Sequence, residues 1–195
     1  MHDSVMRWVG SALTIAELAG KDVLEVGSYD VNGSVRPVIM AAGPARYLGV
    51  DQSPGPGVDM VADALRLPAV LGQDWQPPDI IVSTEMMEHV TDWKASLLGM
   101  ITVLKPGGLL VITTRSPGFG YHGYPEDHWR YTVPQMQQII RAVGLGVLLL
   151  APDPDCEGVF VKACKPEDWA EPPGLSAAWD EVGVYVMTPE GCVPA

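Results

Sequence analysis

The fold follows from one stretch, Val23-Leu24-Glu25-Val26-Gly27-Ser28-Tyr29-Asp30-Val31-Asn32-Gly33-Ser34. An apolar run leads into a polar loop that is bounded by two glycines, and apolar residues then recur at helical spacing from Val35 to Ala42. This order predicts a strand, a tight turn and a helix, the first unit of an α/β sheet. Such sheets bind ligands outside the carboxyl ends of their strands. Gly27 and Gly33, which allow positive φ and a close backbone approach, therefore predict a binding loop.

The loop lacks the dinucleotide pattern. No glycine follows Gly27 at the G-x-G spacing, and no P-loop lysine follows Gly33. This counts against an NAD-dependent oxidoreductase, and Glu25 at the entry to the loop favours a cationic or neutral ligand over a polyphosphate.

On Glu25-x-Gly27 and the small residues after it, the chain resembles the class I S-adenosylmethionine (SAM) dependent methyltransferases. Lys105-Pro106-Gly107-Gly108 before an apolar strand is similar to the same family, whereas Tyr29 replaces its usual middle glycine. The resemblance covers residues 20–164. It implies SAM as cofactor and a Rossmann-like α/β fold with helices on both faces. The implied seven-stranded sheet has the order 3-2-1-4-5-7-6, with strand 7 antiparallel.

Two acidic residues extend the expected cofactor site. Asp51 ends a short strand about 20 residues past the glycine loop, where such sheets place a carboxylate for ribose hydroxyls. The resemblance implies that Asp63 accepts from the adenine amino group and that the backbone of Ala64 contacts the ring. The alternatives are a solvated strand end for Asp51 and a helix cap for Asp63. The expected cofactor site comprises Glu25, Gly27, Ser28, Tyr29, Gly33, Asp51, Gln52, Asp63, Ala64, Thr84 and Glu85.

The remaining elements follow from periodicity and from turn signals. A helix over 4–19 ends at Gly20 and serves either as a cover for the sheet edge or as a lid. Strands are expected at 46–51, 58–61, 79–83, 109–114, 145–150 and 158–163, and helices from residue 85 to Pro106 and from Thr132 to Gly144.

The string Glu85-x-x-Glu88-His89 is the sharpest indication of chemistry. On a helix, these three side chains share one face. The string is similar to that of ubiquinone-pathway O-methyltransferases and of metal-using small-RNA 2′-O-methyltransferases. The second group implies a later histidine, for which His128 is the first choice and His122 the second. The predicted divalent-metal site (Mg, Mn or Zn) is therefore Glu85, Glu88, His89 and His128.

Two alternatives need no metal. His89, His128 and Glu88 are candidate catalytic residues as bases or as substrate contacts. Alternatively, the resemblance to SAM methyltransferases that carry Glu-His after the fourth strand without a metal implies that the glutamate caps the helix N-terminus and the histidine packs under the loop, with a purely structural role.

A long aromatic loop spans 115–131. Loops of this length in a compact domain are usually functional or mobile. Its aromatic residues either wall a pocket for a sugar or aromatic acceptor or anchor the loop on the core. They are Tyr121, Tyr124, Trp129 and Tyr131.

Composition limits the other classes. The chain has 195 residues, 47% of them hydrophobic, and a net charge of −12, which counts against nucleic-acid or anionic-membrane partners. Its three cysteines show no CxxC spacing, no signal peptide precedes the first helix, and no apolar run reaches membrane-spanning length, so we expect a cytoplasmic protein. Residues 1–164 are expected to form the methyltransferase domain. Residues 165–195 form a Pro-rich extension, in which 184–187 predicts an edge strand or a homodimer contact.

The sequence thus predicts a SAM-dependent methyltransferase that O-methylates a hydroxyl of a small molecule or glycan, with or without a metal. A metal-independent N- or O-methyltransferase and a non-catalytic SAM-binding protein are the alternatives. Methylation of RNA ends is opposed by the acidic charge.

Overall fold

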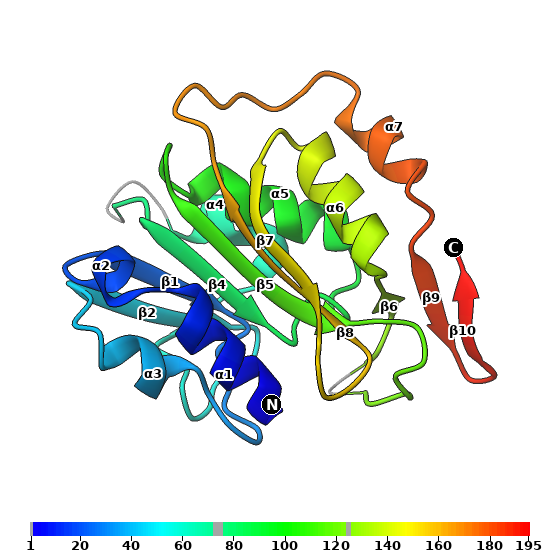
Figure 1. The fold of residues 1–195 in the computed structure, drawn as a ribbon, viewed down its shortest axis with the longest axis horizontal. Helices are drawn as coiled ribbons and strands as arrows, with labels where there is room; N and C mark the ends of the chain where they lie inside the picture. Colours follow the sequence, from blue (N-terminus) through cyan, green and yellow to red (C-terminus); the bar gives the residue numbers. More distant parts are fainter. Residues whose placement is uncertain (1, 72–75, 124–125) are drawn as a thin grey trace.

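The computed structural model describes residues 2–71, 76–123 and 126–195. A seven-stranded sheet has the order β3-β2-β1-β4-β5-β8-β7 (Figure 1). The strands β1 (Asp22–Val26), β2 (Arg46–Asp51), β3 (Met60–Val61), β4 (Ile80–Thr84) and β5 (Leu109–Arg115) run parallel. β8 (Gly158–Cys164) is antiparallel to both β5 and β7 (Gly146–Pro152). The expected fold and strand order are confirmed.

Helices cover both faces of this sheet (Figure 1). One face carries α1 (Asp3–Ala12), α2 (Ile15–Leu18) and α3 (Arg36–Met40), and the other carries α4 (Leu67–Val70), α5 (Trp93–Val103) and α6 (Val133–Ala142). A 3-10 helix, η1 (Ala64–Arg66), precedes α4. The alternation of strand residues explains the two cores: Val23, Val82 and Val111 pack toward α1, whereas Leu24 and its counterparts pack toward α5 and α6.

The single helix expected over 4–19 is wrong. α1 ends at Ala12, and Thr14 starts α2 with a capping box that Glu17 completes. Because Thr14 occupies an extended backbone conformation to make this cap, the helix cannot run through it.

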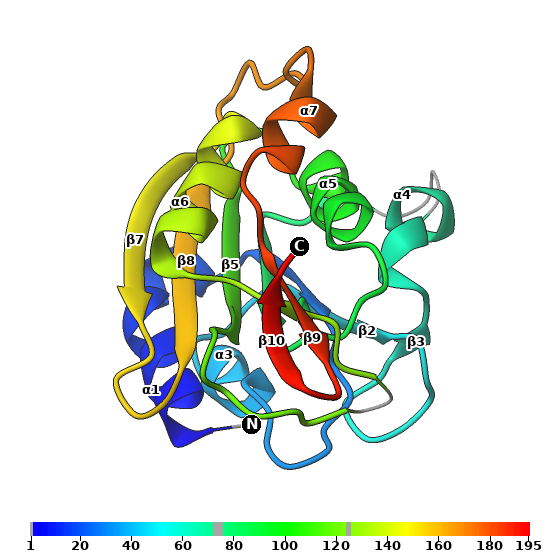
Figure 2. The same ribbon diagram turned by 90° about the vertical axis from the view of Figure 1, so that its right-hand side faces the viewer.

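The C-terminal segment forms a second, three-stranded sheet with part of the long loop (Figure 2). After α7 (Leu175–Asp180), β9 (Tyr185–Thr188) lies between β10 (Gly191–Pro194) and β6 (Trp129–Arg130). β9 is therefore the central strand of this sheet, and the expected edge strand at 184–187 is wrong. None of the helices in the described parts of the chain is long and apolar enough to cross a membrane.

Candidate functional site

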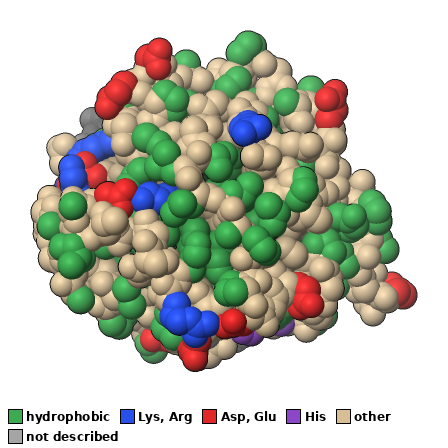
Figure 3. All heavy atoms as spheres, viewed as in Figure 1, with side chains coloured by type: hydrophobic (Ala, Val, Ile, Leu, Met, Phe, Trp, Pro, Cys, Tyr) green, Lys and Arg blue, Asp and Glu red, His purple; other side chains and the backbone are tan. Residues whose placement is uncertain are grey.

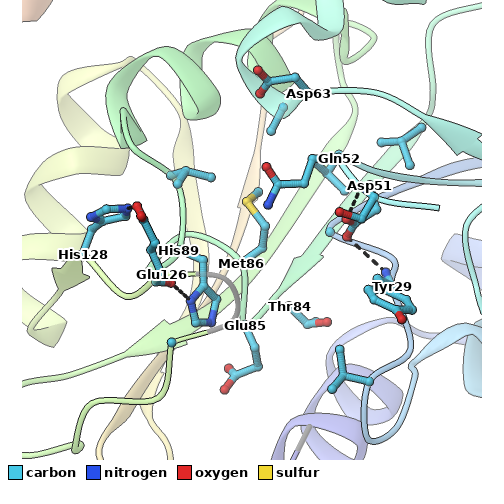
Figure 4. Close-up of a pocket in the computed structure, with 18 of the residues that line it drawn as sticks. Tyr29, Asp51, Gln52, Asp63, Thr84, Glu85, Met86, His89, Glu126 and His128 are labelled. Atoms are coloured by element: carbon cyan, nitrogen blue, oxygen red, sulfur yellow. Dashed lines mark hydrogen bonds and ion pairs between the residues drawn. The ribbon is translucent and has the colours of Figure 1, made fainter. Parts of the chain in front are cut away.

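A cavity of about 800 Å³ opens at the carboxyl ends of β1, β2 and β4. Its wall combines the glycine loop, the turns after β2 and β3, the segment after β4 and the loop before β6. The cavity has two chemically different sides (Figure 4). Asp51 and Asp63 lie on one side, His89 and His128 lie on the other, and Met86 projects between them.

Only glycine fits at position 27 of the glycine loop. Gly27 has φ +83°, and a Cβ built on it would lie 2.6 Å from Cβ and Cγ of Met86. The loop after β1 and the segment after β4 therefore meet directly at the floor of the cavity.

The carboxylate of Asp51 accepts hydrogen bonds from the glycine loop and from the turn that follows β2. Oδ2 accepts from the backbone N–H of Tyr29 at 3.2 Å, and Oδ1 accepts from that of Ser53 at 3.1 Å. The Tyr29 ring packs against Gly55, where an added Cβ would lie 2.2 Å from Cε2. Tyr29 thus lines the cavity without closing it.

The other expected cofactor residues divide into two groups. Gly33, Gln52, Asp63, Ala64, Thr84 and Glu85 line the cavity. One oxygen of Asp63 caps η1 by accepting from the N–H of Leu65 at 2.9 Å, as the helix-cap alternative holds. Thr84 Oγ1 is buried and has no hydrogen-bond partner in the described residues.

Glu25 and Ser28 do not line the cavity. Glu25 points to the α1 and α3 face of the sheet, as Val23 does, because side chains alternate along β1. There the Tyr47 hydroxyl donates to its carboxylate, and burial raises the pKa of Glu25 to about 7. Ser28 is also buried, and its hydroxyl has no partner in the described residues.

The expected helix from residue 85 is wrong. Asp92 caps α5 by accepting from the N–H of Ala95, so the helix begins at Trp93. The Glu85-x-x-Glu88-His89 string instead forms an irregular segment with a turn, in which the N–H of His89 donates to the carbonyl of Met86 at 2.9 Å. Because the string is not helical, the spacing of Glu85, Glu88 and His89 does not show which of these side chains lie close together.

Glu85 turns away from the other two residues of the string. It is a non-glycine residue with a positive φ, +55°. Its carboxylate accepts from Thr113 Oγ1 at 3.0 Å and forms an ion pair with the fully buried Arg115. Both oxygens of Glu85 thus have partners on β5, and Glu85 is not among the residues that converge as a possible ligand set in the described parts of the chain.

Glu88, His89 and His122 converge instead. Their potential ligand atoms all lie within 4.8 Å of one another. Glu88 Oε1 lies 3.8 Å from His89 Nε2 and 3.6 Å from His122 Nε2. The structure therefore groups the second-choice histidine with the string, whereas His128 Nε2 lies 3.1 Å from the carboxylate of Glu126.

The loop that carries His122 is held by a buried ion pair. Arg130 donates to both oxygens of Asp127 and to the carbonyls of Phe119 and Gly120. Burial alone would raise the pKa of Asp127, but the hydrogen bonds from Arg130 outweigh it and hold the pKa below its usual range. Asp127 also accepts from the backbone N–H of His122 at 2.9 Å. The sequence interpretation missed Asp127, because only the folded loop shows what it holds.

The aromatic residues of the loop have different roles. Tyr121 is 64% exposed and lines the cavity. Tyr131 is buried and donates to the carbonyl of Met87, while Trp129 Nε1 donates to the carbonyl of Val90. These two anchor the loop on the segment after β4, and Tyr124 lies outside the described residues.

A family model described as a methyltransferase domain matches residues 4–151, which include β1 to β7. The chain belongs to this methyltransferase family. A search of curated proteins found no significant match for this methyltransferase.

Solved structures share the fold of this methyltransferase. The 1,6-didemethyltoxoflavin-N1-methyltransferase of Burkholderia thailandensis is 14% identical with a TM-score of 0.63, over 83% of this chain and 78% of that chain. The N-methyltransferase NodS of Bradyrhizobium japonicum is 17% identical with a TM-score of 0.59, over 86% and 100%. The magnesium protoporphyrin IX methyltransferase of Synechocystis, solved with bound SAM, is 15% identical with a TM-score of 0.58, over 84% and 77%. The expected class I SAM-dependent methyltransferase fold is confirmed.

Proposed function

We propose that this methyltransferase uses SAM to methylate a hydroxyl of a small molecule or glycan. The observation that carries the proposal is the cavity itself, with an acidic side for the cofactor and a histidine side for the acceptor. Its volume of about 800 Å³ is near the upper end of the roughly 300–1,000 Å³ that ligand pockets span.

The residues of the acidic side suit the parts of SAM. In this proposal Asp51 binds the ribose hydroxyls and Asp63 the adenine, which is supported by the position of both residues in the cavity wall after strands. Gly27 keeps the floor open, and the partnerless hydroxyl of Thr84 is a donor or acceptor for the amino-acid part. SAM supplies the methyl group on a sulfonium, and the protein aligns the acceptor with it.

The histidine side favours oxygen as the methylated atom. The acceptor oxygen forms a bond to the methyl carbon while the carbon–sulfur bond breaks. The electron pair of the broken carbon–sulfur bond stays on sulfur. A hydroxyl must lose its proton in this step. Glu88, His89 and His122 converge as three lone-pair groups beside the cavity, which suits an acceptor that has to be deprotonated. His128 lines the same side of the cavity.

Charge and surface are in accord with a small acceptor. The net charge is −12, and the face seen in Figure 3 shows only small groups of Lys and Arg side chains, several of them next to Asp or Glu. Nucleic-acid affinity depends on clustered positive charge, so RNA is the weaker candidate. A cytoplasmic location and a homodimer stay predictions.

The proposal is tested first by calorimetric titration of SAM into the wild type, Asp51→Ala and Asp168→Ala. Asp168 is an exposed aspartate outside the cavity and serves as the matched control. We expect SAM to bind the wild type and the control equally and Asp51→Ala about 10-fold to 100-fold more weakly, since hydrogen bonds to a charged group contribute about 1.5–3 kcal/mol. Absence of SAM binding in the wild type would refute the proposal.

The acceptor is then sought with SAM labelled in its methyl group. Sugars, diols and catechols are compared with amines under the same conditions. Transfer to hydroxyl compounds supports the proposal, and transfer to amines alone would replace it with N-methylation.

A further inference from the structure

We infer that Glu88, His89 and His122 form a binding site for one divalent transition-metal ion, and that this ion binds the acceptor hydroxyl. This use of the ion rests on the proposed function, whereas the site itself does not. The ligand set differs from the set expected from the sequence, which contained Glu85 and His128 in place of His122.

The first argument is an orphaned carboxylate oxygen. Glu88 is fully buried, and its Oε2 accepts from Thr114 Oγ1 at 2.8 Å. Its Oε1 has no hydrogen-bond partner among the described residues and faces the two imidazoles. A buried ionised oxygen without a partner is costly unless a cation or a donor compensates it.

The second argument is the tautomer of each histidine. His89 Nδ1 lies 2.6 Å from the carbonyl oxygen of Glu126, which can only accept, so Nδ1 carries the hydrogen. His122 Nδ1 is buried without a hydrogen bond in the described residues, but it lies 3.2 Å from the Asp127 carboxylate, whose charge favours the hydrogen on this nitrogen. Both Nε2 atoms then present lone pairs toward Glu88 Oε1. Three lone-pair atoms that face one another are stabilised by a cation between them, because each would otherwise be left without a partner.

The third argument is geometry. Metal–ligand distances of about 2.0–2.1 Å in a tetrahedral site place neighbouring ligand atoms about 3.3 Å apart. The Oε1–Nε2 distances of 3.8 and 3.6 Å exceed this by a few tenths of an ångström, and all three ligand atoms lie within 4.8 Å of one another, so the two imidazoles must also approach each other. Small side-chain rotations close that difference. The separations are at the same time too long for hydrogen bonds.

The fourth argument is the support behind the ligands. A metal-binding histidine typically donates its other N–H to a carboxylate or carbonyl. Here the Glu126 carbonyl takes that place for His89, and the Asp127 carboxylate lies 3.2 Å from Nδ1 of His122, with Arg130 fixing Asp127 from behind. The Arg130–Asp127 ion pair therefore also orients His122 as a metal ligand.

The donor set indicates which ion fits. Two imidazoles and one carboxylate suit Zn²⁺, Fe²⁺, Co²⁺ or Mn²⁺, whereas Mg²⁺ prefers oxygen ligands throughout. His89 and His122 line the cavity, so a remaining coordination position faces the acceptor. The ion would lower the pKa of a bound hydroxyl, whose proton then leaves to water in the cavity.

The test uses the full chain, stripped of metal, without SAM or acceptor. Zn²⁺ binding is measured by calorimetry, and Co²⁺ serves as a spectroscopic probe through its visible absorption. We expect one ion per chain, a Co²⁺ spectrum with nitrogen ligands, and no competition by Mg²⁺. His122→Asn should lower the affinity by more than the roughly 10–100-fold that loss of an outer partner costs, and Asp127→Asn by about that amount.

The matched control is His128→Asn, which changes the histidine that lies outside the cluster and should bind Zn²⁺ as the wild type does. No uptake of Zn²⁺ or Co²⁺ by the folded wild type overturns the inference, and so does uptake that His122→Asn leaves unchanged. His122 is one-third exposed on a loop, so its variant is expected to fold, and circular dichroism verifies this.

The metal site and the proposed function fail in different ways. Ion binding that depends on His122, in a protein that does not bind SAM, would retain the site and refute the function. SAM-dependent methylation that proceeds equally in metal-stripped protein would retain the function and refute the role of the ion.

Discussion

The substitution Glu25→Gln should remove a pH dependence from the stability of this protein. The Glu25 side chain is 1% exposed and accepts a hydrogen bond from the Tyr47 hydroxyl. Burial raises the pKa of Glu25 from 4.5 to about 7. A difference of about 2.5 pH units between the unfolded and folded pKa values corresponds to about 3.4 kcal/mol.

The direction of the effect follows from proton linkage. Because the folded state holds the proton of Glu25 more tightly than the unfolded state does, this stability is fully present below pH 4.5 and is lost as the pH rises to about 7. Between pH 5 and pH 8 the wild type should lose about 2.5 kcal/mol relative to Glu25→Gln, whose amide does not titrate.

The assay is urea unfolding of both proteins at pH 5 and at pH 8. The difference between the two proteins is taken at each pH, which cancels the other titrating groups. Glu181→Gln, the same substitution at an exposed position, is the matched control. If the wild type and Glu25→Gln differ by the same free energy at both pH values, the buried, proton-retaining Glu25 is the wrong description.

Three further outcomes are expected. Gly27→Ala should lose about 1–2 kcal/mol from its positive φ, and its added clash with Met86 should weaken SAM binding in calorimetry. Gly27→Val should abolish that binding, and unchanged affinity in both variants would refute the mapped cofactor site. Trp179→Ala should lower the unfolding free energy by about 3–5 kcal/mol, because the indole is buried and donates to the Ile139 carbonyl. This hydrogen bond couples the C-terminal segment to α6. A thermal scan with a separate, earlier transition of residues 165–195 would contradict that coupling.

The sequence was sufficient for the sheet because each strand carries its own signal. Leu109–Arg115 and Gly158–Cys164 are apolar runs bounded by turn residues, and the structure pairs them as expected. The antiparallel insertion of β8, however, came from the family resemblance alone. Alternation within a strand does not show which neighbour it will have.

The helix boundaries show where local signals were overlooked. Thr14 and Glu17 form a capping box that is legible in the sequence, and it breaks the predicted first helix. Asp92 is likewise a cap signal directly before the apolar spacing of α5. In both cases a cap residue outweighed the periodicity of the apolar positions.

The histidine cluster could not be predicted from spacing. Glu85 and Glu88 are three residues apart, yet the positive φ of Glu85 and its ion pair with Arg115 send the two carboxylates to different partners. Spacing in the sequence does not distinguish His122 from His128 as a partner for Glu88 and His89. The fold of their loop decides which histidine joins the cluster. That fold depends on the buried Arg130, whose partners are distributed over the loop from Phe119 to Trp129.

The C-terminal segment connects with this loop and so with the histidine side of the cavity. β9 pairs with β6, and the N–H of Met187 donates to the carbonyl of His128 at 2.7 Å. On the other side of the same segment, the N–H groups of His128 and Trp129 donate to the carbonyl of Glu88. The segment that carries His128 is therefore held between the extension and the turn that carries Glu88. Because backbone hydrogen bonds fix it from both sides, the position of His128 depends on β9 as well as on the turn after β4.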